Sequence, residues 1–175
     1  MEAAYGVSTT SWPVPKPPAT IAPMTGGPAS GSDECVFCAI AAKKAEASVV
    51  HEDETVVVFM DLNPVTPGHL LVEPRKHAVG LEELDAATGA HVWSVGHQMA
   101  RALRRSGLHC DGINVFLADG EVAGQEVFHF HLHVIPRYAR DGFSISADWK
   151  GRDRALLDQD AEAIKEALAL GLGGG

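Results

Sequence analysis

One run of nine residues in the last third of the chain constrains its fold most strongly. Histidine alternates with apolar residues along it, as Val127-Phe-His-Phe-His-Leu-His-Val-Ile135. Because successive side chains of a β-strand point to opposite faces, the pattern predicts a strand over 127–135 with three imidazoles on one face. A single histidine on a strand is usually structural, whereas three in strict alternation indicate chemistry. One face of the predicted sheet therefore packs in a core, and the other carries a site.

The neighbouring segments predict further strands and a long helix. Apolar residues at spacings of three and four between Leu84 and Leu103 form one face of a helix. Turn-forming residues at 63–68 join two extended segments as a hairpin. Two hairpins separated by a long helix favour antiparallel pairing, and hence an α+β fold. The expected strands are 55–59, 69–72, 113–117 and 127–135, and the expected helices are 38–47, 84–103 and 153–170.

Composition divides the chain into three parts. Residues 1–32 hold six of the ten prolines, and proline removes backbone donors and fixes φ, so this segment is predicted to be a disordered Pro/Gly-rich tail. Residues 33–150 have the composition of a folded domain. Residues 151–175 are predicted to form a C-terminal amphipathic helix followed by a frayed glycine-rich end.

Charge and hydropathy exclude several kinds of partner. The chain has 14 Lys and Arg against 23 Asp and Glu, a formal net charge of −9, which argues against a nucleic acid polymer as its main ligand. It has no apolar run long enough to span a membrane, and its start lacks the pattern of a secretory signal. Its three cysteines do not make a disulfide framework of the secreted kind. We expect a soluble, cytoplasmic protein.

The three alternating histidines leave two chemical interpretations open. They are suited to chelating a metal, since neutral imidazole is a common nitrogen ligand. Alternatively, one ring is a nucleophile and its neighbours donate hydrogen bonds to a phosphoryl or nucleotidyl group. The glycine-containing loop 120–125 lies just upstream, and its backbone N–H groups are candidates for binding anionic oxygens. A phosphate-containing substrate fits both features.

The segment His129-Phe-His131-Leu-His133-Val-Ile135 resembles the motif that names the histidine-triad (HIT) superfamily. The resemblance to bacterial members covers roughly residues 33–150, with further matching segments in the same order and at similar spacing. These are Cys35-Val-Phe-Cys38, Phe59-Met-Asp61-Leu-Asn-Pro-Val-Thr-Pro-Gly-His69, Val72-Glu-Pro-Arg-Lys-His77, Ala123-Gly-Gln125, Pro136-Arg-Tyr138 and the Trp149-Lys150 region.

The resemblance implies both a fold and an activity. The expected domain is α+β, with a five-stranded antiparallel sheet, one long helix and one or two short helices, paired as a homodimer with a continuous sheet. The expected activity is that of a nucleotidyl hydrolase or transferase acting on phosphoanhydride or P–N bonds, without an organic cofactor. The implied substrate is a purine nucleotide conjugate: a phosphoramidate, an adenylylated compound or a dinucleoside polyphosphate. The alternative is a nucleotide-binding regulatory protein with little turnover.

The family also implies roles for individual catalytic residues. His131 matches the histidine that attacks the α-phosphate and forms a nucleotidyl-histidine intermediate. His133 and His69 match residues that contact phosphate oxygens or the departing group. Gln125 matches a phosphate-contacting position. A histidine with an ordinary pKa of about 6.5 is largely neutral near pH 7, as a nucleophile must be.

Two of the residues expected to form the nucleoside pocket could have a purely structural role instead. Asp61 matches the residue that binds the ribose hydroxyls, and a carboxylate is able to accept from two vicinal hydroxyls at once. Asp61 would equally cap the turn that follows it. Phe59 and Leu62 match walls around the base, and Phe59 is as well suited to the core.

A structural zinc site is implied by four residues. Cys35 and Cys38 supply two thiolates in a Cys-x-x-Cys pair, and tetrahedral zinc needs two more ligands. Bacterial members with this pair complete the site with the residues that match His77 and His129. The alternative is a pair of reduced cysteines at the start of a helix.

Two positions depart from the usual family pattern. Ala118 stands where many members have asparagine near the phosphates, and Glu126 stands where many have serine or threonine. A carboxylate at 126 would either repel polyphosphate or point to solvent. These departures leave the substrate and rate open, and they are the residues that support the regulatory alternative.

Overall fold

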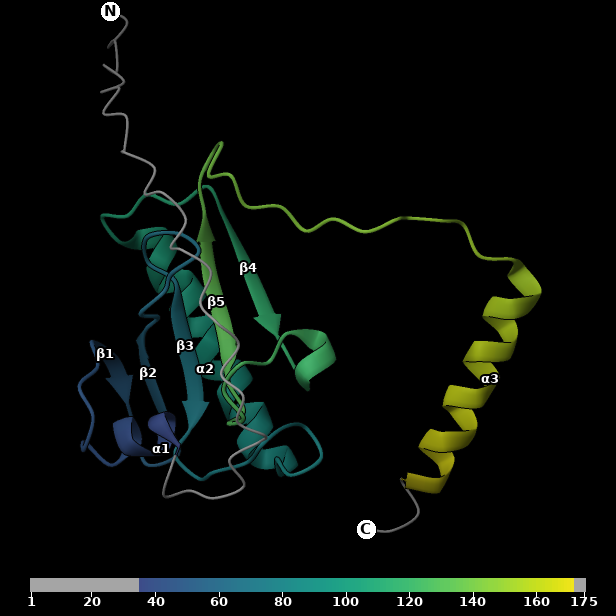
Figure 1. The fold of residues 1–175 in the computed structure, drawn as a ribbon, viewed down its shortest axis with the longest axis horizontal. Coiled ribbons are helices and arrows are strands. Elements are labelled where there is room, and N and C mark those ends of the chain that lie inside the picture. Colours follow the sequence, from purple (N-terminus) through teal and green to yellow (C-terminus); the bar gives the residue numbers. More distant parts are fainter. Residues whose placement is uncertain (1–34, 172–175) are drawn as a thin grey trace, which may run out of the picture.

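The computed structural model describes residues 35–171. The predicted tail over 1–32 and the last four residues of the glycine-rich end lie outside the described residues. Residues 35–171 form one antiparallel sheet of five strands in the order β1-β2-β3-β5-β4, with three α-helices and a short 3-10 helix (Figure 1). The predicted α+β class and five-stranded sheet are therefore confirmed. The strands are β1 (Val49–Glu52), β2 (Val56–Met60), β3 (Leu70–Pro74), β4 (Gly112–Leu117) and β5 (Leu132–Arg137), and the helices are α1 (Val36–Ala41), α2 (Ala86–Arg105), η1 (Glu121–Ala123) and α3 (Arg154–Gly171).

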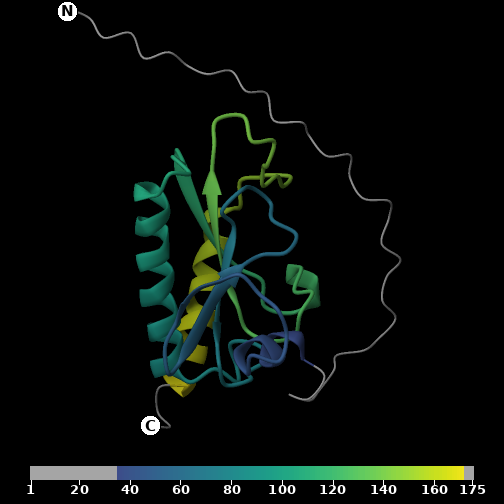
Figure 2. The same cartoon turned by 90° about the vertical axis from the view of Figure 1, so that its left-hand side faces the viewer.

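The sheet separates two apolar clusters, because alternate residues of β2 and β3 point to opposite faces. Val56 and Val58 join the larger cluster beneath α2, whereas Val57 and Phe59 join a smaller one that includes Phe37 of α1. Figure 2 shows α2 on one side of the sheet, with α1 and η1 on the other. The alternation over residues 130–134 follows the same rule, since Phe130, Leu132 and Val134 belong to the cluster beneath α2, as predicted.

Helix α2 confirms the predicted long helix and shows what its apolar stripe does. The side chain of Asp85 caps the helix by accepting from the N–H of Thr88 at 2.9 Å. Val92, Val95 and Leu103 are buried against the sheet. The apolar stripe of α2 therefore faces the core of the same chain. If α2 contributes to the expected homodimer, it does so through a different face of the helix.

The first helix differs from the prediction of 38–47. It begins two residues earlier, at Val36, and ends at Ala41. Lys43 has a φ of 60°, and the N–H groups of Lys44 and Ala45 both donate to the carbonyl of Ala39. This left-handed termination stops the helix although the residues beyond it are good helix formers.

The histidine strand is shorter than predicted. Strand β5 begins at Leu132, so residues 127–131 precede it. Pairing with β3 runs from Leu70↔Val134 to Val72↔Leu132 and stops there. The next residues of β3 lead to Pro74, which has no N–H to donate. The N–H of Phe130 donates instead to the carbonyl of Ala78.

Two further elements were described incompletely by the residue pattern. Strand β1 was not among the expected strands. Its pairing with β2 has a register shift between Val49 and His51. The last helix lies close to the predicted range, but at 18 residues it is a second long helix. It stands apart from the sheet in Figure 1, with its apolar side chains exposed. Among residues 35–171, no helix has the length and apolar character needed to cross a bilayer.

Candidate active site and metal site

The ring of His131 is held in one tautomer by the backbone just before β5. Its Nδ1 lies 2.6 Å from the carbonyl oxygen of His129. A carbonyl only accepts, so Nδ1 carries the proton and Nε2 keeps its lone pair. The side chain is 5% exposed, and burial lowers the pKa of His131. The ring is therefore neutral near pH 7, with an unprotonated Nε2 that has the properties of a nucleophile.

His133 is held in one tautomer by a short chain of hydrogen bonds. The N–H of Val65 donates to Nδ1 of His69 at 3.2 Å, which places the proton of His69 on Nε2. That N–H in turn donates to Nδ1 of His133 at 2.9 Å. Burial, followed by the neighbouring His131 and His69, lowers the pKa of His133 to about 4. Neutral His133 thus has its N–H at Nε2, where it is a donor for an anionic oxygen.

Asp61 lies beside this pair and caps a turn. Its Oδ1 accepts from the N–H of Asn63 at 2.8 Å, so Asp61 does cap the turn. Its contact with ribose hydroxyls stays a prediction. Its Oδ2 is 3.3 Å from Nδ1 of His69. The ligand atoms of Asp61, His69 and His133 lie within 4.8 Å of one another. A metal bound there would compete with the hydrogen bond that the two histidines share.

The two predicted walls of the base pocket differ in their surroundings. Phe59 is 3% exposed and packs in the smaller apolar cluster, so its core role is real. Leu62 is 92% exposed and lies in the loop after β2. Their contact with a base stays a prediction.

Gln125 organises the loop that precedes the histidines. Its Nε2 donates to the carbonyls of Val79 and Val127, and its Oε1 accepts from the N–H of Gly120. The side chain is buried, and these bonds hold the loop in place. Its contact with phosphate stays a prediction.

The loop itself differs from the anion cradle expected at 120–125. The N–H groups of Gly120, Ala123, Gly124 and Gln125 all donate within the loop, so in this conformation they do not face an anion. Of the two departures from the family pattern, Ala118 is buried and the side chain of Glu126 is exposed to solvent.

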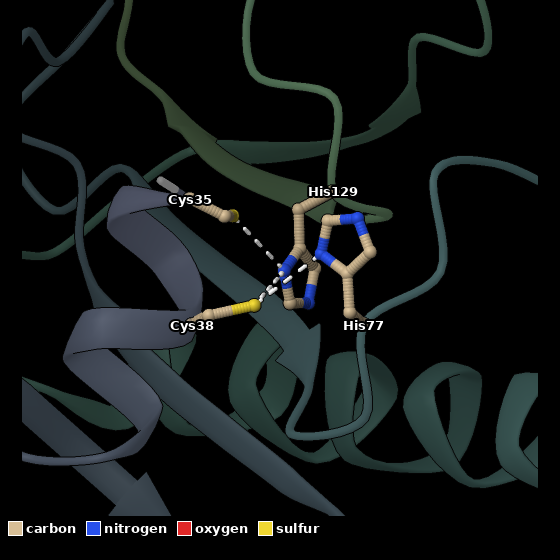
Figure 3. Close-up of side chains that lie close together, drawn as sticks. All are labelled: Cys35, Cys38, His77 and His129. Atoms are coloured by element: carbon tan, nitrogen blue, oxygen red, sulfur yellow. Dashed lines mark hydrogen bonds between the residues drawn. The ribbon is translucent and has the colours of Figure 1, made fainter. Parts of the chain in front are cut away.

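The four predicted zinc ligands converge, and Figure 3 shows their side chains pointing toward one another. Nδ1 of His129 is 3.5 Å from Sγ of both Cys35 and Cys38, and Nδ1 of His77 is 3.3 Å from Sγ of Cys38. Tetrahedral zinc, with its usual bond lengths to sulfur and nitrogen, separates such donors by about 3.5 Å. The donor types and their spacing both fit zinc.

Groups around the cluster also fit a cation. Nε2 of His129 is 2.8 Å from the carbonyl of Pro74, so its proton is on Nε2 and its Nδ1 lone pair faces the thiols. Burial raises the pKa of the Cys38 thiol to about 11, with the nearby Glu73 adding to the rise. Glu73 is itself fully buried, and neither carboxyl oxygen has a hydrogen-bond partner among residues 35–171. Burial also raises the pKa of Glu73, to about 8, so both groups are protonated near pH 7. A divalent cation would favour the thiolate and carboxylate forms, which metal ligands require.

The three motif histidines therefore have three different surroundings. His129 faces two thiols, Nδ1 of His131 faces a carbonyl, and Nδ1 of His133 faces His69. This arrangement does not support a site in which all three bind one metal, an interpretation that the alternation alone left open.

Sequence reasoning gave no role to two side chains at this site. Glu73 is an acid inside an otherwise apolar strand, which was the available signal. Phe37 stands between the two cysteines, and its ring meets the ring of His131 edge-on, with centroids 5.1 Å apart. Its position in the Cys-x-x-Cys pair was the only hint.

Comparison with known proteins places the chain among close relatives. Residues 42–140 match the family described as the HIT domain. An uncharacterized HIT-like protein of Borreliella burgdorferi is 40% identical over 135 residues, covering 76% of this chain and 92% of that protein. The protein named "hit" of Bacillus subtilis is 36% identical over 139 residues, covering 79% and 94%.

Solved structures give the same result. A Zn-bound histidine triad family protein from Mycobacterium smegmatis is 43% identical with a TM-score of 0.63, covering 76% of this chain and 99% of that one. A HIT family protein from Bacillus anthracis is 38% identical with a TM-score of 0.70, covering 77% and 97%. A histidine triad nucleotide-binding protein from Candida albicans is 25% identical with a TM-score of 0.70, covering 78% and 98%.

Proposed function

Because this chain belongs to the HIT domain family, we propose that it is a nucleotide hydrolase that cleaves at the α-phosphate of a purine nucleotide conjugate. The substrate class is a phosphoramidate, an adenylylated compound or a dinucleoside polyphosphate. The observation that carries the proposal is the hydrogen bond between Nδ1 of His131 and the carbonyl of His129, which leaves Nε2 as a neutral nucleophile.

The first chemical step forms a bond from Nε2 of His131 to the α-phosphorus. The bond from phosphorus to the departing group breaks, and its electron pair leaves with that group, which takes a proton from solvent. The resulting nucleotidyl-imidazolium carries a positive charge and keeps its proton on Nδ1. The carbonyl of His129, 2.6 Å away, stabilises that proton and the charge.

The second step releases the nucleotide. Water attacks the α-phosphorus, the P–N bond breaks, and its electron pair returns to Nε2 of His131 while the water loses a proton to solvent. Throughout both steps His133 donates from Nε2 to an oxygen of the phosphoryl group, oriented by His69. Asp61 holds the ribose hydroxyls, Phe59 and Leu62 border the base, and Gln125 positions the loop beside the phosphate.

Zinc in the Cys35, Cys38, His77 and His129 cluster is proposed to be structural. When bound, it crosslinks α1 to the segment before β5 and takes no part in the bond changes. The Zn-bound relative from M. smegmatis supports this assignment, as do the donor types and spacing described above.

A turnover screen tests the proposed activity. We expect measurable hydrolysis of a purine nucleoside phosphoramidate, a dinucleoside tetraphosphate or an aminoacyl adenylate, with the nucleoside monophosphate as one product; sugar nucleotides belong in the same panel. A parallel binding assay uses a non-hydrolysable analogue. Tight binding without turnover on any of these compounds would contradict the hydrolase and favour the regulatory alternative, to which Ala118 and the exposed Glu126 point.

We also propose that the protein is a homodimer, with α2 contributing to the interface. Strand β4 is an edge of the sheet, and its Val115 and Phe116 are 38% and 43% exposed. Trp93 of α2 is 61% exposed. An exposed apolar edge strand is a ready site for pairing with another copy. Light scattering at micromolar concentration is expected to give twice the 18.5 kDa chain mass.

A matched pair of variants locates that interface. Val115→Lys places a charge on β4 and is expected to give a monomer. Val49→Lys places the same charge on β1, at the opposite edge of the sheet and at a similar exposure of 48%, and is expected to leave the dimer intact. A wild-type monomer, or equal effects of the two substitutions, would show that the proposed interface is wrong.

A further inference from the structure

Three contacts surround the ring of His131, and only one of them is a hydrogen bond. The ring of His133 lies on one side of it, at 4.8 Å between centroids, and the other two contacts come from His129 and Phe37. The bond from Nδ1 to the carbonyl of His129 fixes one atom of the ring. Rotation about that bond would still swing Nε2 away from its line of attack. The edge-on contact with Phe37, at 5.1 Å between centroids and an interplanar angle of 87°, restricts that rotation.

Phe37 is itself held firmly in place. It is 7% exposed and meets two further rings edge-on, Phe59 at 5.4 Å and His129 at 5.9 Å between centroids. It therefore lies between the nucleophile and a predicted zinc ligand, in contact with both.

The turn that carries Phe37 depends on the two cysteines. Helix α1 has only six residues, and its N-cap Cys35 makes no capping hydrogen bond through its side chain. A helix this short is not stable alone. Cys35 and Cys38 occupy the N-cap and the third helical position, so binding of both thiolates to one ion would fix this turn, with Phe37 between them.

We propose that Phe37 is a positioning residue for the nucleophile, holding the His131 ring at its angle of attack from the zinc-binding turn. This inference rests on the proposed function. The turn formed by Cys35 and Cys38 then has two roles: it stabilises the fold, and it holds Phe37 against the ring of His131.

The test uses the zinc-loaded full-length protein carrying Phe37→Leu, which keeps an apolar side chain but has no flat ring. We expect kcat to fall by at least about tenfold, because a small misplacement of a reacting group is costly in rate. KM is expected to stay within about threefold, and the zinc content is expected to equal that of wild type.

Val57→Ala is the matched control. Val57 is 1% exposed and lies in the same apolar cluster. The variant therefore loses packing but keeps the ring beside His131. Its kcat is expected to stay near the wild-type value.

A second readout does not depend on turnover. In ¹⁵N spectra of the wild type, His131 is expected to show one ring environment with the proton on Nδ1. Phe37→Leu is expected to broaden or split that signal, and Val57→Ala is expected to leave it sharp.

An unchanged His131 signal in Phe37→Leu would overturn the proposal. A raised KM with unchanged kcat would also overturn it, because Phe37 would then be only a wall of the substrate pocket. If the wild type hydrolyses nothing in the panel, the proposed function fails, and the spectra alone still decide the role of Phe37.

Discussion

Replacing His131 with alanine is expected to abolish turnover while leaving nucleotide affinity within a few-fold of wild type. Covalent catalysis does not proceed without the attacking nitrogen. The proposed contacts with the nucleotide come from other groups, namely Asp61, the residues expected around the base and the Nε2 donor of His133. Steady-state kinetics on the best substrate of the panel measures the first effect, and calorimetry with a non-hydrolysable analogue measures the second.

The neighbouring histidine supplies the comparison for this experiment. His133→Ala removes a hydrogen-bond donor and leaves the nucleophile in place, so kcat is expected to fall by about 10²–10³-fold without loss of the covalent step. Should His131→Ala keep more than about a hundredth of wild-type activity, which is far more than lost nucleophiles usually leave, another group must be the nucleophile.

Loss of zinc is expected to have the largest effect on stability. Metal analysis of protein purified without chelator is expected to find one zinc per chain. Cys38→Ser removes one ligand, and we expect its Tm to fall by at least about 10 °C, because the free energy of metal binding contributes to folding. His129→Ala is expected to act in the same way, since His129 lies in the cluster and not at the phosphate.

Cys110→Ser is the control for the zinc experiment. Cys110 is half-buried against the larger apolar cluster and lies outside the group of four ligands, so the same change of sulfur to oxygen is expected to alter Tm only slightly. A zinc content well below one per chain would contradict the assignment and leave the cysteines as a reduced pair. Equal losses of Tm in the two cysteine variants would also contradict it.

Periodicity predicted the parts of this fold that depend on local pattern. The stripe from Leu84 to Leu103 identified α2, and the alternation around His131 correctly separated a core face from a site face. The starting point of β5 was not predictable in this way. It depends on Pro74, which lies in a strand more than fifty residues earlier in the chain.

The candidate site depends even more on contacts that are distant in sequence. Cys38 lies 39 residues from His77 and 91 residues from His129, so no local pattern joins them, and the resemblance to a family supplied the ligand set. The tautomer of His131 depends on the direction of one backbone carbonyl. The burial of Glu73 without a partner depends on how the sheet packs. These features are set by the tertiary structure and have no local sequence pattern.

Trapping the intermediate tests the covalent mechanism most directly. A slowly hydrolysed substrate is mixed with wild-type enzyme, the reaction is quenched in base to protect the P–N bond, and the digested protein is analysed by mass spectrometry. The mechanism predicts a nucleoside-monophosphate adduct on the peptide that contains His131, formed also by His133→Ala and lost in His131→Ala. An adduct on any other residue, or turnover by an enzyme that forms none under these conditions, would contradict it.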